Sequence, residues 1–74
     1  MDKYLERIKR ATNRQQLLDI TCEAFKDTKL SKKQDDILTA CAVWKEVQFR
    51  GEKDALDECA KQLKIPTKYI KAIQ

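Results

Sequence analysis

The scarcity of residues that make tight turns constrains the fold of this chain more than any other feature. The chain holds one glycine and one proline in 74 residues, which leaves little material for the hairpin turns of a β-sheet. Its alanine, leucine, lysine, glutamate and glutamine residues favour the α-helix instead. We therefore expect one domain over residues 1–74, an all-α fold with a small bundle of four to five short helices around one long central helix.

Capping signals and apolar spacing indicate where these helices begin and end. Thr12 and Ser31 each stand three residues before a glutamine, the pattern of a capping box at a helix start. Gly51 is expected at a left-handed helix end, and Pro66 in the first turn of the last helix. The expected helices are Lys3–Ala11, Asn13–Lys26, Lys32–Phe49, Asp54–Leu63 and Thr67–Ile73.

The core-facing side of each helix is predicted from apolar residues three and four positions apart. For the five helices in turn these are Tyr4, Leu5, Ile8 and Ala11; Leu18, Cys22 and Phe25, flanked by Leu17 and Thr21; Ile37, Ala40, Cys41, Trp44 and Val47; Leu56, Cys59, Ala60 and Leu63; and Ile70 and Ile73. Trp44 is expected in the core, with a partner surface as the alternative. The three cysteines fall on these faces, so we expect buried, reduced thiols, with a redox sensor as the alternative.

Several classes of function lack the residues that they usually need. The chain has no histidine, which removes Ser-His and Cys-His catalysis and most zinc sites. The adjacent carboxylates at residues 35–36 and 57–58 point to different faces of their helices and do not converge. No apolar run approaches the roughly 18 residues of a membrane span. We expect a cytoplasmic protein that is not an enzyme and has no catalytic residue, metal, cofactor, small-molecule substrate or membrane contact.

The charge of the chain is divided into three blocks. The net charge is +4 over residues 1–33, −4 over residues 34–58 and +4 over residues 59–74. Basic ends suit either DNA or an acidic protein surface, and they also suit pairing with the chain's own middle or a second copy.

One interpretation of the basic C-terminal block is a small helix-turn-helix over residues 55–74. The apolar spacing there resembles that of the motif, in which a small alanine lets two helices cross closely. Lys64 occupies the turn position that glycine usually fills, and the last helix is only about two turns long. The DNA-binding candidates on this alternative are Thr67, Lys68 and Lys71.

A second resemblance runs along the whole chain and is carried by three segments. They are "YLERIKR" at Tyr4–Arg10, "LSKKQDDI" at Leu30–Ile37 with Ala42 beyond it, and "KIPTKYIKAI" at Lys64–Ile73. Their order and spacing resemble the Hha/YmoA family of small helical proteins. Members of that family modulate bacterial gene silencing by binding the oligomerisation region of the nucleoid-structuring protein H-NS.

The resemblance implies a nucleoid-associated modulator of bacterial transcription whose partner is an H-NS-like protein, with DNA bound only weakly or indirectly. Where the family's long helix carries an aspartate, this chain has Trp44, so that part of the family's charged surface is not carried over. The basic positions of the family's first helix have basic residues in this chain too, and we add Lys45 of the long helix to them. The predicted partner-binding residues are Arg7, Lys9, Arg10 and Lys45.

Overall fold

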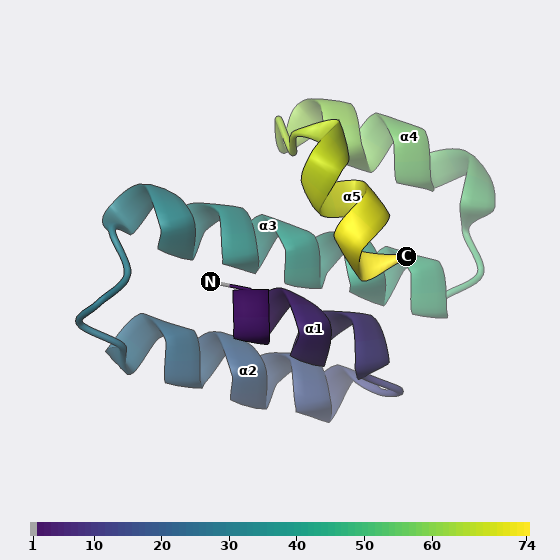
Figure 1. Cartoon of the computed structure of the whole chain (residues 1–74). Helices are drawn as coiled ribbons and strands as arrows, with labels where there is room; N and C mark the ends of the chain where they lie inside the picture. The colour runs from purple at the N-terminus through teal and green to yellow at the C-terminus, as the bar shows by residue number, and fades with distance from the viewer. Residues whose placement is uncertain (1) are drawn as a thin grey trace.

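The computed structural model describes residues 2–74 and confirms the predicted all-α fold. Five helices are present in this range and no strand (Figure 1). They are α1 (Asp2–Arg10), α2 (Arg14–Lys26), α3 (Lys32–Phe49), α4 (Lys53–Gln62) and α5 (Thr67–Ile73). The longest helix, α3, is central, because it packs against each of the other four.

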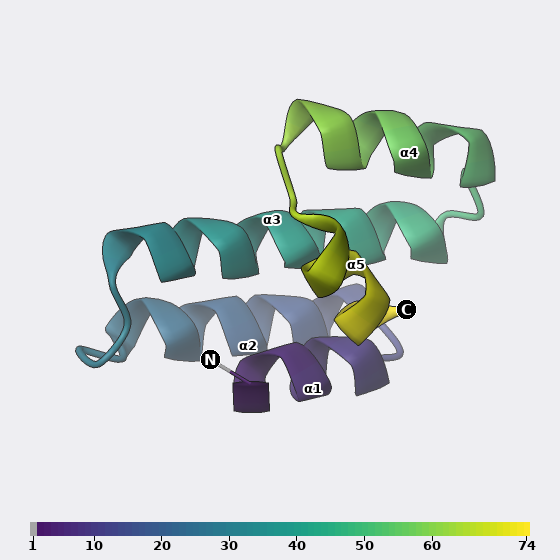
Figure 2. The same ribbon diagram turned by 45° about the horizontal axis from the view of Figure 1, so that its top comes forward.

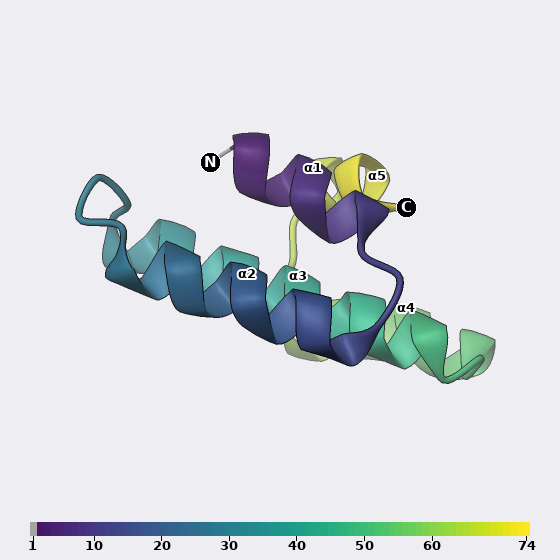
Figure 3. The same ribbon diagram turned by 90° about the horizontal axis from the view of Figure 1, so that it is seen from below.

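The helices form two layers. The neighbours α2, α3 and α4 lie side by side, with α3 in the middle (Figure 2). The shorter α1 and α5 pack against each other and lie together on one face of that layer (Figure 3). The first and last helices of the chain thus close the core from the same side, and the other face of the three-helix layer has no helix over it among residues 2–74.

The predicted start of α3 is confirmed in detail. Gln34 donates its backbone N–H to Ser31 Oγ at 3.2 Å, and Ser31 donates its own to Gln34 Oε1 at 2.9 Å. The start of α2 differs by one residue from the prediction. Asn13, not Thr12, accepts the Gln16 backbone N–H, at 2.9 Å, because the asparagine side chain stands at the position from which the first turn can be reached.

Both predicted breaks of the chain occur at left-handed residues. Gly51 follows the end of α3 with a φ of 75°, as predicted. Lys64 follows the end of α4 with a φ of 56°. Its backbone N–H donates to Lys61 O at 3.2 Å, and that of Ile65 donates to Ala60 O at 3.1 Å. This pair of bonds is a Schellman motif, and it turns the chain towards Pro66 and α5.

The core is built from side chains of α1, α2, α3 and α5. Trp44 is buried, as predicted, and Ile8, Cys41 and Ile73 lie wholly out of solvent. Leu63 was predicted to face inward but is exposed. It stands at the C-terminal cap of α4, directly before the left-handed Lys64. The buried apolar residues are Tyr4, Leu5, Ile8, Ala11, Leu17, Ile20, Ala24, Leu38, Cys41, Ala42, Trp44, Ile65 and Ile73.

The predicted core face of α2 is wrong. The helix buries Leu17, Ile20 and Ala24, whereas the predicted Leu18, Cys22 and Phe25 are exposed. Two apolar stripes lie side by side on this helix, and the stripe with the small alanine faces α1 and α3. In this orientation Glu23 and Asp27 face α1 and bond to it. Cys22 is therefore not the buried thiol that was expected, while Cys41 is buried and Cys59 half-buried.

Candidate functional site

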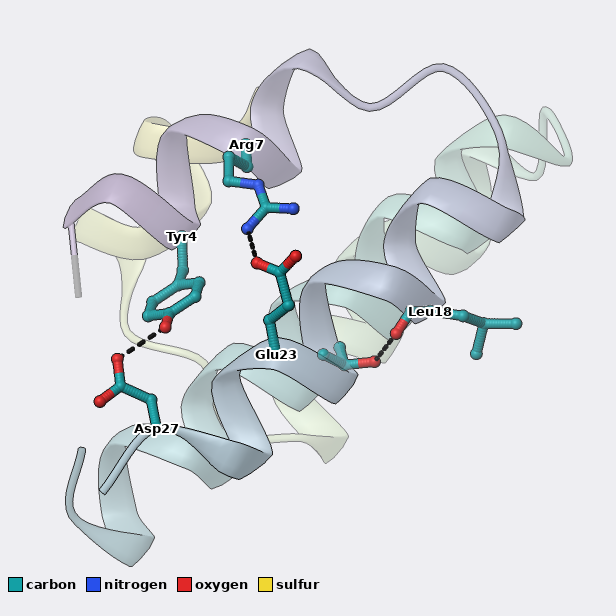
Figure 4. Close-up of polar contacts among 6 residues, drawn as sticks. Tyr4, Arg7, Leu18, Glu23 and Asp27 are labelled. Atoms are coloured by element: carbon teal, nitrogen blue, oxygen red, sulfur yellow. Dashed lines mark hydrogen bonds and ion pairs between the residues drawn. The ribbon is translucent and has the colours of Figure 1, made fainter. Parts of the chain in front are cut away.

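Two polar bonds join the basic helix α1 to α2 and to the residue that follows it. Tyr4 donates its hydroxyl to Asp27 Oδ2 at 2.6 Å, and the Arg7 guanidinium pairs with Glu23 (Figure 4). The bond from Tyr4 lowers the pKa of Asp27, and the bond from Arg7 lowers the pKa of Glu23. The partners' own pKa values move the other way, because each bond favours the protonated tyrosine and the charged arginine.

Arg7 and Arg10 form the exposed basic face of α1. Arg10 Nε lies 2.8 Å from Glu6 Oε1, one turn back on the same helix. The side chains of Arg7 and Arg10 are 42% and 78% exposed. Both border the same open hollow at the α1–α2 corner, which Asp19 also lines. Exposed ion pairs of this kind contribute roughly 0–1 kcal/mol each, so both guanidiniums can exchange their present partners at little cost.

Lys9 does not belong to this face. Residues two apart on a helix point to different sides, and Lys9 lies near enough to Lys45 for its charge to lower the pKa of that lysine. The predicted set on α1 is therefore divided, with Arg7 and Arg10 turned towards α2 and Lys9 turned away from them.

Lys45 is not on the molecular surface, which corrects its assignment to the exposed partner-binding set. The residue is 5% exposed, and its Nζ donates to the backbone carbonyl of Ile73 at 2.9 Å. Burial is the main cause that lowers its pKa. The ammonium thus holds one of the last carbonyls of α5, where a positive charge also meets the negative end of the helix dipole.

The DNA-binding candidates of the alternative interpretation are brought together on α5. Thr67, Lys68 and Lys71 are all exposed, and Lys68 Nζ lies 5.0 Å from the centre of the Tyr69 ring. The packing of α5 is nevertheless committed to α1 and α3. Only seven residues long, it offers a short surface for reading a DNA groove.

The sequence prediction missed an apolar groove between α2 and α3. We call it the outer groove, and its signal in the sequence was the second apolar stripe of α2. The groove measures about 120 Å³. It is lined by Arg14, Leu17, Leu18, Thr21, Thr39, Ala42, Val43 and Glu46.

Residues 2–74 hold neither a cluster of metal ligands nor a membrane-spanning helix. Their cysteine, aspartate and glutamate side chains form no group that could hold a metal ion. None of the five helices combines the length and apolar character needed to cross a membrane. In comparisons of the chain with family models, curated proteins and solved structures, no match was found.

Proposed function

We propose that this protein is a non-enzymatic modulator of bacterial gene expression that binds an acidic helical surface of a nucleoid-associated, H-NS-like protein. The observation that carries the proposal is the pair of exposed guanidiniums on α1. Arg7 and Arg10 stand one turn apart, and each is held only by an exposed carboxylate of its own chain. The resemblance of three sequence segments to the Hha/YmoA family supports the same kind of partner.

The chemistry of arginine suits such a partner. A guanidinium presents donors in a planar fork that fits a carboxylate, and it stays charged at every physiological pH. Because Arg7 and Arg10 lie on one side of a helix whose apolar face is already buried, they can meet an acidic helix without unfolding anything. Attraction between such surfaces raises the rate of association, and it weakens as the salt concentration rises.

The test is calorimetric titration of the purified chain with the purified oligomerisation region of H-NS. The double variant Arg7→Ala/Arg10→Ala removes the proposed contact and should weaken binding by about tenfold or more. The double variant Lys53→Ala/Lys61→Ala makes the same change of charge at two exposed positions of α4 and should bind as the wild type does. If both double variants lose affinity equally, the loss is explained by net charge alone, which would contradict the proposal.

Binding of DNA by α5 is the second candidate function, and the exposure of Thr67, Lys68 and Lys71 favours it. If these lysines bind phosphates, the variant Lys68→Ala/Lys71→Ala should reduce the dependence of affinity on salt by about 0.9 in log–log slope for each phosphate that is no longer bound. Titration of the chain alone with duplex DNA measures that slope. An unchanged slope would remove α5 from any DNA contact.

A further inference from the structure

Two exposed apolar side chains, Leu18 and Val43, line the outer groove, and Phe25, which does not line it, is exposed further along α2. Phe25 is 81% exposed, Leu18 45% and Val43 41%. Leu18 and Phe25 lie two turns apart on α2, so one stands above the other on the same side of the helix, and Cys22 lies exposed between them in the sequence. In Figure 4 the Leu18 side chain points away from α2 into solvent. Exposed apolar side chains that gather on one part of a surface mark interaction sites more often than single ones do.

The size of the groove favours the side chains of a helix over a small molecule. Pockets for drug-sized ligands measure about 300–1,000 Å³, whereas the outer groove measures about 120 Å³. Its walls are two neighbouring helices, and an amphipathic helix can place apolar residues from successive turns between such walls.

The charges at one end of the groove identify the character of that helix. Arg50 Nη2 lies 2.9 Å from Glu46 Oε1, and Arg14 Nε lies 3.5 Å from the same oxygen atom. The two arginine side chains are 58% and 71% exposed. Two guanidiniums therefore share one carboxylate, which leaves an excess positive charge beside the apolar stripe. A carboxylate from a partner would balance this charge, whereas a partner's lysine would be repelled.

We propose that the outer groove binds an amphipathic helix whose apolar stripe is flanked by acidic residues. In this arrangement the apolar side chains of the partner lie over Leu18 and Val43 in the groove and extend along α2 to Phe25. Its acidic residues meet Arg14 and Arg50. The inference rests on the proposed function for its class of partner, an acidic helix, and assigns that partner a second contact surface besides α1.

The experiment uses the full chain labelled with ¹⁵N and synthetic helical peptides of about 20 residues, a length at which isolated helices form. One peptide has a leucine stripe flanked by glutamates. A second has the same stripe flanked by lysines, and a third keeps the glutamates but replaces the leucines by serine. We expect only the first to bind, with amide shifts concentrated at Leu18, Phe25 and Val43.

Two variants locate the contact. Leu18→Ser/Phe25→Ser should weaken binding of the first peptide by about tenfold or more, the size of effect expected for apolar anchors. Leu63→Ser changes an exposed leucine at the end of α4, away from the groove, and should leave the affinity unchanged. Circular dichroism of both variants checks that the helices remain intact, which is expected because all three side chains are exposed.

The outcomes separate this inference from the function proposed for α1. Shifts confined to Arg7 and Arg10 would overturn the groove assignment and leave the α1 proposal standing. Shifts confined to the groove would support the groove assignment, and an absence of shifts would overturn it. The role of α1 is decided separately, by the titration of Arg7→Ala/Arg10→Ala with the oligomerisation region of H-NS. Equal binding of the lysine-flanked peptide would overturn the acidic partner. If the amide shifts at the groove grow with the concentration of the protein alone, without peptide, the occupant of the groove is a second copy of the chain and not an acidic partner helix.

Discussion

Lys64 holds a backbone conformation that L-amino acids with a side chain rarely adopt, so replacing it by glycine should stabilise the protein. Its φ of 56° lies in the left-handed region, which costs a residue with a Cβ roughly 1–2 kcal/mol. Glycine removes that cost, but its more flexible unfolded state offsets about 0.5–1 kcal/mol of the gain. The expected net effect of Lys64→Gly is a free energy of unfolding higher by about 0.5–1 kcal/mol.

In a domain of this size such a gain raises the melting temperature by about 2–8 °C, which thermal unfolding followed by circular dichroism resolves. Lys64→Ala is the control that separates the effect of backbone strain on stability from the effect of charge. It removes the ammonium group and keeps the strained left-handed conformation. Lys61→Gly, within α4, should instead lower the stability by about 1 kcal/mol, since glycine is a poor helix residue. If Lys64→Gly melts no higher than Lys64→Ala, then α4 does not end in the Schellman turn that directs α5 onto α1.

Three further predictions concern the core and its polar bonds. Cys41→Ser should lower the free energy of unfolding by about 1–3 kcal/mol because it buries a hydroxyl, whereas Cys22→Ser should change it by less than about 0.5 kcal/mol. Burial raises the pKa of Cys41 to about 11, so a thiol reagent at pH 8 should modify Cys22 and spare Cys41. Ile73→Ala should cost about 2–4 kcal/mol in a urea titration, and a wild-type midpoint would show that α5 is frayed. In Tyr4→Phe the pKa of Asp27, measured by NMR titration, should rise towards its ordinary value of 3.8. A carboxyl whose pKa is lower in the folded state than in the unfolded state stabilises the fold fully above its unfolded-state pKa. That stabilisation is lost as the pH falls through its folded-state pKa. Because Tyr4→Phe reduces the difference between the two pKa values of Asp27, this variant should lose less stability on acidification than the wild type.

Much of the fold was predictable because local signals and tertiary packing agree. The Ser31 capping box begins α3, and Gly51 ends it in the left-handed conformation. Trp44 and Cys41 fall on the face that the apolar spacing predicted. At these positions the conformational preference of the residue and its spacing along the chain are enough to predict the structure. Neither depends on which neighbouring helix packs against it.

The rotation of α2 could not be predicted from periodicity. The stripe with Leu18 and Phe25 and the stripe with Leu17 and Ala24 have the same helical spacing, and the first has the larger side chains. Which of them enters the core depends on how α2 packs against α1 and α3, and hence on residues far from it in the chain. A helix with two apolar stripes therefore leaves its orientation to tertiary structure.

The candidate site was predictable only in part, for a related reason. Arg7 and Arg10 are exposed as expected, because their helix has one clear apolar face. Lys45 was predicted as a partner-binding residue, yet it lies four residues after Cys41 on the buried side of α3. Its acceptor, the Ile73 carbonyl, is 28 residues away in the chain. No local pattern predicts such a partner.

We propose above all that this protein acts by binding an acidic helical protein and not by reading DNA. The most direct test measures two affinities side by side at about 0.15 M salt, where the screening length is about 8 Å. The purified chain is titrated with the oligomerisation region of H-NS and, separately, with duplex DNAs of different sequence. We expect saturable binding to the protein that is weakened in Arg7→Ala/Arg10→Ala, and weak binding to DNA without sequence preference. Tight binding of the chain alone to one defined DNA sequence, abolished in Lys68→Ala/Lys71→Ala, would contradict the claim.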